Sequence, residues 1–343
     1  MSLTPREREI VALLRSDPML DAASLAERIG STRAAVSVHL SNLMKKGVVR
    51  GRGYILRAEA DSVVVVGGAV LDTKVRTAFA PVLGTSNPGT ASATVGGVGR
   101  NIAENLARLG GRVALVSVVG SDPDGDWLLQ ETALAGVDVA PVLRGGRTGR
   151  YVAVLDADGD LVAGVSDMAA TDAVTPEVLD HDLLRSAALV VVDGNLPVPT
   201  VDAVLALGVR VVIDPVSVAK AARISPLLSG KRPVFAITPN QDELAAMGSV
   251  ADLHRRGVEV VWVRRGPAGS LLSTPEGEVD LPAPAVTPVD VTGAGDAMLA
   301  AFCHRVLAGD ALAEAAAYGH RAAALTVASP HTVVPDLHER MAP

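Results

Sequence analysis

Cysteine and aromatic residues are scarce in this sequence of 343 residues, which has one cysteine, Cys303, and 2 % aromatics. A single thiol excludes a disulfide framework and a cysteine-based metal site, so we interpret Cys303 as a buried packing residue. With so few aromatics, the core has to be built mainly from Val, Leu and Ala. Hydrophobic residues reach 49 % of the chain, and its length allows one large domain with a smaller one.

Long apolar runs and two common nucleotide-binding loops are also missing. No apolar run approaches the roughly 18 residues that a membrane span needs, and the charged N-terminus lacks the apolar region of a signal peptide. We therefore expect a soluble cytoplasmic protein. No G-x-x-x-x-G-K-[ST] occurs, which excludes a P-loop enzyme, and Gly67-Gly68 does not begin a G-x-G-x-x-G, which disfavours a dinucleotide site.

Charge is divided unevenly along the chain. Residues 1–57 contain ten Lys and Arg against five Asp and Glu, a balance of +5, and the remainder has a balance of −12. A small basic segment and a large acidic segment indicate separate units with separate partners. We predict two domains, residues 1–57 and residues 62–343.

The basic segment has the pattern of three short helices followed by a hairpin. Helices are predicted from Thr4-Pro5, from Ser24 to Ile29, and from a Ser31 cap to about Lys46. Residues 48–56 then suggest two short strands around a glycine-rich tip. This order resembles a winged helix-turn-helix DNA-binding domain, and the alternative is a helical interaction module with a solvated basic face.

The resemblance to a winged helix implies duplex DNA as a partner. The third helix would enter the major groove and the basic residues after it would contact phosphates. His39 lies on that helix, but by itself it is more typical of an ordinary polar helix residue. The residues implied for the interface are Thr32, Arg33, Ser37 and His39 in the groove, and Lys45, Lys46, Arg50 and Arg52 on the phosphates.

From residue 62 onward, short Val-rich runs alternate with helical stretches. Continuous apolar runs of this kind are typical of a parallel sheet covered on both faces, so the predicted class is α/β. Two stretches, 71–95 and 148–168, break the alternation and suggest hairpin-like additions that form a lid. The predicted strands are Ser62–Val66, Ala114–Val118, Leu189–Val192, Val209–Ile213, Val234–Ile237 and Val258–Val263, and the predicted helices include Arg100–Leu109 and Asp126–Ala135.

The segment from Asp290 to Asp296 is a glycine-rich turn that opens a helix, with Asp296 in its first turn. Free backbone N–H groups at a helix start bind anions, and glycines let the backbone approach them closely. A carboxylate there could accept a proton from an attacking hydroxyl. The motif therefore suggests a kinase with an Asp base and a backbone anion hole, and equally a helix capped by an Asp.

Two further motifs are compatible with a ligand site. In residues 96–101 small residues leave room against the backbone, and Asn101 can donate and accept hydrogen bonds, as sugar hydroxyls require. The alternative is a loop whose Asn faces solvent. In residues 238–243, Asn240 and Glu243 have the spacing of a capping box, and Glu243 could equally serve Mg²⁺ through water; both readings could hold.

These three motifs follow the order and rough spacing seen in ribokinase-like sugar and nucleoside kinases, the PfkB family, which residues 62–340 resemble. The resemblance implies a ribokinase-like fold: a mostly parallel sheet with helices on both faces and a small β lid. It also implies an ATP-dependent kinase. Shorter pieces resemble the pseudouridine kinases of that family: residues 68–72, 166–168, 193–196 and 214–220.

The resemblance also implies a role for individual residues. Asp296 would take the proton of the sugar 5′-hydroxyl, and Gly293, Ala294 and Gly295 would stabilise the transferred phosphoryl group. The substrate would contact Asp72, Gly97, Asn101 and Asp167. Mg²⁺ would be organised by Asn240 and Glu243. ATP would lie across Gly266 and Gly269 near His320. A monovalent cation such as K⁺ would lie near Asp290 and Thr292, with Ser329 a weaker candidate.

One position departs from the family pattern. Many relatives have Thr-x-Gly where this chain has Arg264-Arg265-Gly266. Arg264 could contact ATP phosphates or point to solvent. Two other functions stay open: another sugar or nucleoside kinase activity, or a transcription regulator with a ligand-sensing kinase-like domain. The intact Asp296 motif favours an enzyme, and a homodimer is compatible with either function.

Overall fold

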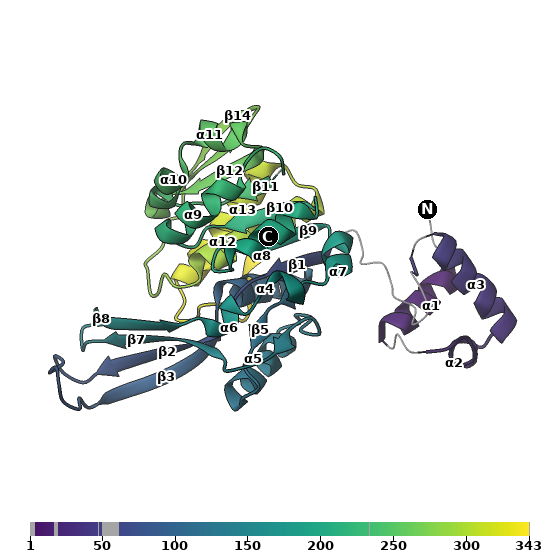
Figure 1. The fold of residues 1–343 in the computed structure, drawn as a ribbon, viewed down its shortest axis with the longest axis horizontal. Helices are drawn as coiled ribbons and strands as arrows, with labels where there is room; N and C mark the ends of the chain where they lie inside the picture. The colour runs from purple at the N-terminus through teal and green to yellow at the C-terminus, as the bar shows by residue number, and fades with distance from the viewer. Residues whose placement is uncertain (1–3, 17–19, 47, 50–61, 233, 343) are drawn as a thin grey trace. The chain divides into compact units, whose positions relative to one another are not determined.

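The structure is a computed structural model that describes residues 4–16, 20–46, 48–49, 62–232 and 234–342. It divides into two compact units, Met1–Glu59 and Ala60–Pro343 (Figure 1), and each is described by itself. Among the helices of the described residues, none is long and apolar enough to cross a membrane.

The first unit contains three helices, α1 Pro5–Ser16, α2 Ala22–Arg28 and α3 Arg33–Lys45. Their apolar faces meet in one cluster that includes Ile10, Leu14, Leu25, Leu40 and Leu43. The prediction of three helices is confirmed, but two predicted starts are wrong. α2 begins at Ala22, two residues before the predicted start at about Ser24, and Asp21 is its cap. Thr32, not the predicted Ser31, caps α3; each cap accepts the backbone N–H three residues ahead. The predicted tip and second strand of the wing, at 50–56, lie outside the described residues.

The second unit is built on a sheet of eight strands in the order β14-β13-β12-β11-β10-β9-β1-β4. Within this sheet the neighbouring strands β12, β11, β10, β9, β1 and β4 are all parallel. The remaining strands, β13 and β14, pair antiparallel. Two strands begin two positions from their predicted starts, β4 earlier and β10 later. The bounds are β1 Ser62–Val66, β4 Arg112–Val116, β9 Leu189–Asp193, β10 Val211–Asp214, β11 Val234–Ile237, β12 Val258–Arg264, β13 Ser270–Thr274 and β14 Gly277–Leu281.

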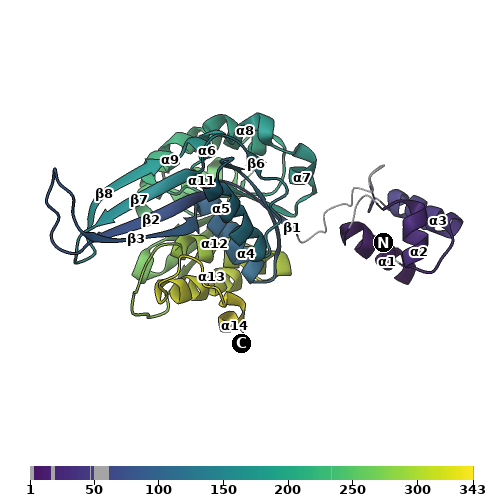
Figure 2. The same ribbon diagram turned by 90° about the horizontal axis from the view of Figure 1, so that it is seen from below.

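Helices cover both faces of this sheet, as the continuous apolar strands predicted (Figure 2). On β1, Val63 and Val65 face one layer and Val64 and Val66 face the other. The first layer has α4 Val98–Arg108, α5 Pro123–Leu134, α12 Ala294–Ala308 and α13 Leu312–Val327, and the second has α7 His181–Ser186, α8 Val198–Ala206, α9 Val218–Ile224, α10 Gln241–Met247 and α11 Val250–Arg255.

A second, four-stranded sheet in the order β3-β2-β7-β8 extends away from the body (Figure 1). It is formed by β2 Val70–Thr77, β3 Gly89–Gly96, β7 Gly149–Leu155 and β8 Leu161–Asp167, so the two stretches predicted as additions do form a separate lid. The smaller elements are β5 Val118–Val119, β6 Leu143–Arg144, α6 Ala169–Asp172 and α14 Leu337–Met341, with 3-10 turns at Pro176–Val178, Ser225–Leu227 and Gly266–Ala268.

Candidate active site

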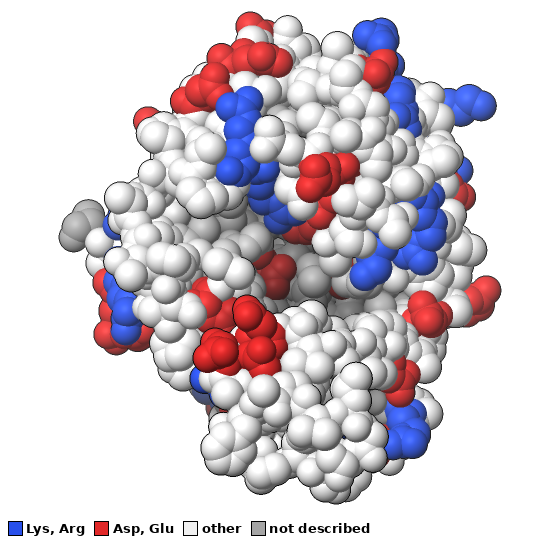
Figure 3. Space-filling view, turned by 90° about the vertical axis from the view of Figure 1, so that its left-hand side faces the viewer, with Lys and Arg blue, Asp and Glu red and all other residues white. Residues whose placement is uncertain are grey.

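The parallel strands end at one edge of the sheet, beside the lid, and the residues predicted for the site gather there. Figure 3 shows that this side of the molecule is hollowed, with charged side chains inside and around the hollow. In an open α/β sheet, ligands bind beyond the carboxyl ends of the strands, where the strand order reverses. Here the order reverses around β1, since the chain passes from β1 to β4 on one side and then to β9 on the other.

The start of α12 has the features of an anion site. Its N-cap Gly293 has φ +79°, and a side chain there would collide with the carbonyl of Thr332. The N–H of Ala294 donates to Val291 O at 3.3 Å. In the described residues, the backbone N–H groups of Gly295 and Asp296 have no backbone hydrogen-bond partner. Two free donors at a helix start can therefore receive an anion.

Asp296 lies in that first turn with only 9 % of its surface exposed. Asn101 Nδ2 donates to Asp296 Oδ2 at 2.9 Å, which joins α12 to α4. Burial raises the pKa of Asp296 to about 7; the neighbouring carboxylates of Asp214 and Asp193 add to the rise, and the Asn101 hydrogen bond and Arg264 oppose it. A carboxylate with a pKa near neutrality is matched to general-base chemistry.

The start of α4 is also rich in glycine but is closed by the protein itself. Its N-cap Gly97 has φ +98°, and a Cβ there would come within 2.6 Å of Gly68 O. Asp193, at the end of β9, accepts from the N–H groups of Gly68 at 2.9 Å and Gly99 at 3.2 Å. Burial raises the pKa of Asp193, although the hydrogen bonds from Asn195 and Gly68 oppose the rise. Asn101 is thereby held facing Asp296.

The two predicted substrate carboxylates lie on the lid. Asp72 is half-buried on β2, and burial raises its pKa against the opposing charges of Lys74 and Arg100. Asp167 ends β8 and is exposed, and its Oδ1 accepts from Ala169 N at 3.3 Å. Tyr151 of β7 pairs with Asp72 on one side and with Ser166 on the other, so Asp72 and Asp167 are two strands apart at the same end of the lid.

Arg264, at the end of β12, is held by carboxylates. Its Nη1 and Nη2 donate to Asp214 Oδ2 and Oδ1 at 3.0 and 3.2 Å, and Nη2 lies 3.5 Å from Glu243 Oε2. Burial acts to lower the pKa of Arg264, but Asp214 and Glu243 outweigh it and raise the pKa. A Cβ on Gly295 would lie 2.7 Å from Arg264 Nη1, so the guanidinium is directly beside the start of α12.

The loop after β10 is strained where it presents Asp214. Val216 has φ +67°, the only positive value at a non-glycine residue among the described residues. A β-branched residue in this region is an outlier, and such strain concentrates at functional sites. The N–H of Val216 donates to Asp214 Oδ1 at 2.9 Å, which fixes the carboxylate towards Arg264.

Asn240 and Glu243 form the capping box that their spacing predicts. Asn240 N donates to Glu243 Oε2 at 2.9 Å, and Glu243 N donates to Asn240 Oδ1 at 2.8 Å. Glu243 is 2 % exposed, and burial raises its pKa. The described residues contain no group of three or more metal-ligating side chains. One carboxylate still fits Mg²⁺, which typically binds one or two carboxylates and completes its shell with water and phosphate.

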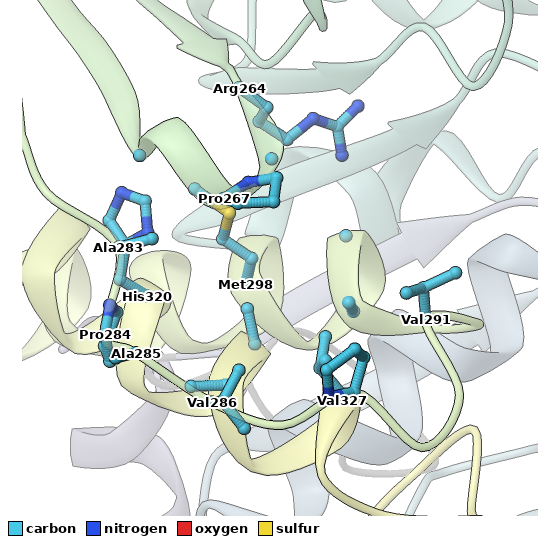
Figure 4. Close-up of a pocket in the computed structure, with 17 residues that line it drawn as sticks. Arg264, Pro267, Ala283, Pro284, Ala285, Val286, Val291, Met298, His320 and Val327 are labelled. Atoms are coloured by element: carbon cyan, nitrogen blue, oxygen red, sulfur yellow. The ribbon is translucent and has the colours of Figure 1, made fainter.

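A cavity of about 600 Å³ lies between β12 and the helices α12 and α13 (Figure 4). Arg264, Gly266, Gly269 and His320 all line it, and most of the remaining lining is apolar. His320 Nε2 is hydrogen-bonded to Ser270 Oγ at 2.7 Å, and burial lowers the pKa of the imidazole, which favours the neutral ring. The cavity opens onto Ala294 and Gly295, so a nucleotide base in it would direct its phosphates to the start of α12.

The predicted monovalent-cation residues have other partners. Asp290 Oδ1 accepts from Thr292 N at 2.8 Å and from Thr292 Oγ1 at 2.6 Å, and Asp290 Oδ2 accepts from Lys74 Nζ at 2.6 Å. Partial burial acts to raise the pKa of Asp290, but these hydrogen bonds outweigh it and lower the pKa. Ser329 Oγ accepts from His331 N at 3.1 Å.

In the first unit, the residues predicted to contact DNA differ in whether their side chains are exposed and free of other partners. Arg33, Ser37 and Lys45 are exposed on α3, whereas the side chain of Thr32 caps the helix. The ammonium of Lys46 donates to both oxygens of Glu7, at 2.9 and 2.7 Å, and Glu7 is 1 % exposed. Hydrogen bonds from Lys46 and Thr4 lower the pKa of Glu7 to about 2. A phosphate contact by Lys46 would have to compete with this pair. His39 is half-buried, and Arg50 and Arg52 lie outside the described residues.

Three charged residues of the site had no predicted role: Lys74, Asp193 and Asp214. The two aspartates each follow an apolar strand, and a carboxylate at the carboxyl end of a buried parallel strand is a usable signal for a site. Nothing in the sequence around Lys74 indicates a partner 216 positions away.

A doubly covered parallel sheet, a buried carboxylate beside two free helix N–H groups and an adjoining nucleotide-sized cavity define an ATP-dependent phosphotransferase of the ribokinase-like fold. The chain belongs to the pfkB family of carbohydrate kinases, whose model matches residues 60–339. Residues 3–50 match the model of a winged helix-turn-helix DNA-binding domain. The chain is thus a PfkB-type sugar or nucleoside kinase with an N-terminal winged helix.

Individual relatives agree with this family. The chain is 36 % identical to "Uncharacterized sugar kinase YeiI" of Escherichia coli (strain K12), over 94 % of each chain. It is 32 % identical to the pseudouridine kinase of the same strain, over 81 % of this chain and 94 % of that one. Among solved structures, Arabidopsis thaliana ribokinase complexed with ribose and ATP has a TM-score of 0.71 and 25 % identity, over 82 % of this chain and 98 % of that one.

Proposed function

We propose that the chain transfers the γ-phosphoryl group of ATP to the 5′-hydroxyl of a ribosyl substrate, and that this substrate is pseudouridine. The observation that carries the phosphoryl transfer is Asp296, buried beside the two free N–H groups of α12 and held by Asn101. The identity to the pseudouridine kinase of Escherichia coli supports the substrate.

In this proposal Asp296 accepts the proton of the 5′-hydroxyl as its oxygen attacks the γ-phosphorus. A bond forms between that oxygen and phosphorus, the bond to the β,γ-bridging oxygen breaks, and ADP leaves. The free N–H groups of Gly295 and Asp296 stabilise the charge on the transferred group, whereas the predicted N–H of Ala294 is engaged by Val291 O. Mg²⁺ bound with the nucleotide, through Glu243 and water, would neutralise phosphate charge.

The remaining residues position the two substrates. Arg264 is next to Gly295, so its guanidinium adds positive charge where the phosphates arrive. Gly266, Gly269 and His320 line the cavity for the base of ATP. Asp72, with Gly97 and Asn101, binds the ribose, and Asp167 on the lid binds the ribose or the uracil edge.

A phosphate-transfer screen tests this function. Purified protein with ATP and Mg²⁺ is offered pseudouridine, uridine, adenosine, ribose and fructose 6-phosphate, and ADP release is measured. Pseudouridine has a ring N–H that uridine lacks, and a pocket that binds this group can discriminate by orders of magnitude. We expect kcat/KM to be highest for pseudouridine. Equal efficiency with uridine, or preference for a free sugar, would contradict the proposed substrate.

We also propose that the first unit binds duplex DNA, so that the protein joins a kinase to transcriptional regulation. The match to the winged-helix family model supports this, as does the exposure of Arg33, Ser37 and Lys45 on α3. The groove contacts would come from α3, and Lys45 with Arg50 and Arg52 would meet phosphates.

A mobility-shift assay of the full-length protein on genomic fragments tests DNA binding at low and moderate salt. Phosphate contacts release counterions, so the affinity should fall steeply as salt rises. Arg50→Ala with Arg52→Ala should weaken binding to all sequences, and Arg33→Ala should change sequence preference. Arg265→Ala, in the kinase unit, is the control. Absence of binding at both salt concentrations would mean that the unit serves a protein contact instead.

A further inference from the structure

Lys74 extends from the lid to the loop that precedes α12. Its Nζ lies 2.6 Å from Asp290 Oδ2, and the two side chains are 43 % and 26 % exposed. Successive side chains of a strand alternate between faces, so Lys74 leaves β2 on the same face as Asp72, two residues earlier. One strand of the lid therefore carries both a candidate substrate carboxylate and a cation that reaches the body.

Asp290 begins the segment that forms the anion site. The N–H groups of Val289 and Asp290 both donate to Val327 O, at 2.8 and 3.3 Å, which fixes this segment against the end of α13. An uncompensated carboxylate so near the start of α12 would oppose the binding of phosphate there. A cation on Asp290 removes that repulsion.

Both carboxylate oxygens of Asp290 already accept hydrogen bonds, and this arrangement does not fit a free monovalent cation. The resemblance to the PfkB family implies K⁺ near Asp290 and Thr292. One oxygen of Asp290 already accepts from the Lys74 ammonium, and the other accepts from both the N–H and the hydroxyl of Thr292. A K⁺ ion on the same carboxylate would lie next to the ammonium and be repelled by it.

We propose that Lys74 is a positioning residue whose ammonium group takes the place of the free monovalent cation at Asp290. The proposal rests on the proposed role of the α12 start as the phosphoryl site. Because Lys74 and Asp72 share the strand β2, the strand that carries a candidate substrate carboxylate also carries the cation that compensates Asp290. The enzyme therefore does not depend on K⁺.

Enzyme activity in KCl and in tetramethylammonium chloride of equal ionic strength tests whether the Lys74 ammonium replaces K⁺. In the wild type, the two salts should give the same kcat within about twofold. Lys74→Met keeps the apolar stem and removes the charge; it should lose about tenfold in tetramethylammonium, less than the loss of a direct oxyanion donor, and recover in KCl. Arg76→Met is the matched control, since Arg76 is exposed on the same face of β2, and it should behave as the wild type.

Thermal unfolding provides a second readout that needs no acceptor, so failure of the proposed substrate stays distinguishable from failure of this proposal. KCl should raise the Tm of Lys74→Met above its value in tetramethylammonium chloride and leave the wild type unchanged. Adding Asp290→Asn to Lys74→Met should abolish this response. K⁺ activation of the wild type beyond about twofold would overturn the proposal, as would a Lys74→Met variant whose activity and Tm are the same in the two salts.

Discussion

The helices α4 and α12 begin in similar ways but differ in what meets their N-termini. Both have a glycine N-cap with positive φ and no side-chain cap. At α4 the N–H of Gly99 donates to the buried carboxylate of Asp193, so the protein supplies its own anion. At α12 the N–H groups of Gly295 and Asp296 have no partner in the described part of the chain.

This difference assigns the two starts different tasks. The closed start of α4 cannot receive an external anion: it fixes the direction of Asn101, which in turn donates to Asp296 at 2.9 Å. The open start of α12 is available to an external anion, and the adjacent cavity leads to it. Similar glycine-rich sequences thus produce an occupied helix start in one place and an open helix start in the other.

The largest effect should follow from changing the open start. Asp296→Asn retains the shape of the side chain and can still accept from Asn101, but it cannot take a proton. A positioned base contributes roughly 10²–10⁴-fold, so kcat should fall at least 10²-fold while ADP still binds. Steady-state kinetics and calorimetric titration with ADP measure the two quantities. The N-cap of α12 is Gly293 and no side chain caps this helix, so the alternative that Asp296 is a helix cap is wrong. A near-normal kcat would show that Asp296 is not the base.

Arg264→Met should come second, because it leaves Asp214 and Glu243 as buried carboxylates without their cation. Removal of one partner of a buried ion pair costs about 3–5 kcal/mol in the free energy of unfolding. The KM for ATP should rise as well, since the guanidinium is next to Gly295. Arg265→Met is the control, because the partner of Arg265, Asp280, is 75 % exposed. Equal losses in the two variants would argue against the network.

Asp193→Asn tests the closed start with a smaller expected effect. An amide can present only one oxygen, so either the N–H groups of Gly68 and Gly99 or those of Asn195 lose their acceptor. An unsatisfied buried donor costs about 1–3 kcal/mol in the free energy of unfolding. The KM for the acceptor should rise because Asn101 shifts, with the KM for ATP unchanged. Asp180→Asn, at the exposed cap of α7, should change neither KM.

The smallest effect concerns the pH dependence of stability. The pKa of Asp296 is raised from 3.8 to about 7 in the folded protein. Between these values the folded state holds a proton that the unfolded state has released, so this group makes stability fall as pH rises. Asp296→Asn removes this dependence, and its stability relative to the wild type should increase by at least about 1 kcal/mol between pH 5 and pH 8. Urea unfolding of both proteins at pH 5 and pH 8 measures this change. If the difference in unfolding free energy between the two proteins is the same at both pH values, the raised pKa of Asp296 is contradicted.

The sequence predicted much of this arrangement because periodicity and glycine-rich turns are local signals. The strand Ser62–Val66, the lid stretches and the helix start at residues 293–296 were all predicted from neighbouring residues. The pairs between Arg264 and Asp214 and between Lys74 and Asp290 were not, since their members lie 50 and 216 positions apart. Long-range pairs depend on sheet order and side-chain direction, which no short segment contains.

We propose that phosphoryl transfer takes place at the open start of α12, with Asp296 as the base. The dependence of kcat/KM for the acceptor on pH tests it most directly. A base must be deprotonated, so the wild type should gain activity with rising pH and reach a plateau, with a midpoint near the Asp296 pKa of about 7. The residual activity of Asp296→Asn should lack this transition. The same transition in both proteins would contradict the account.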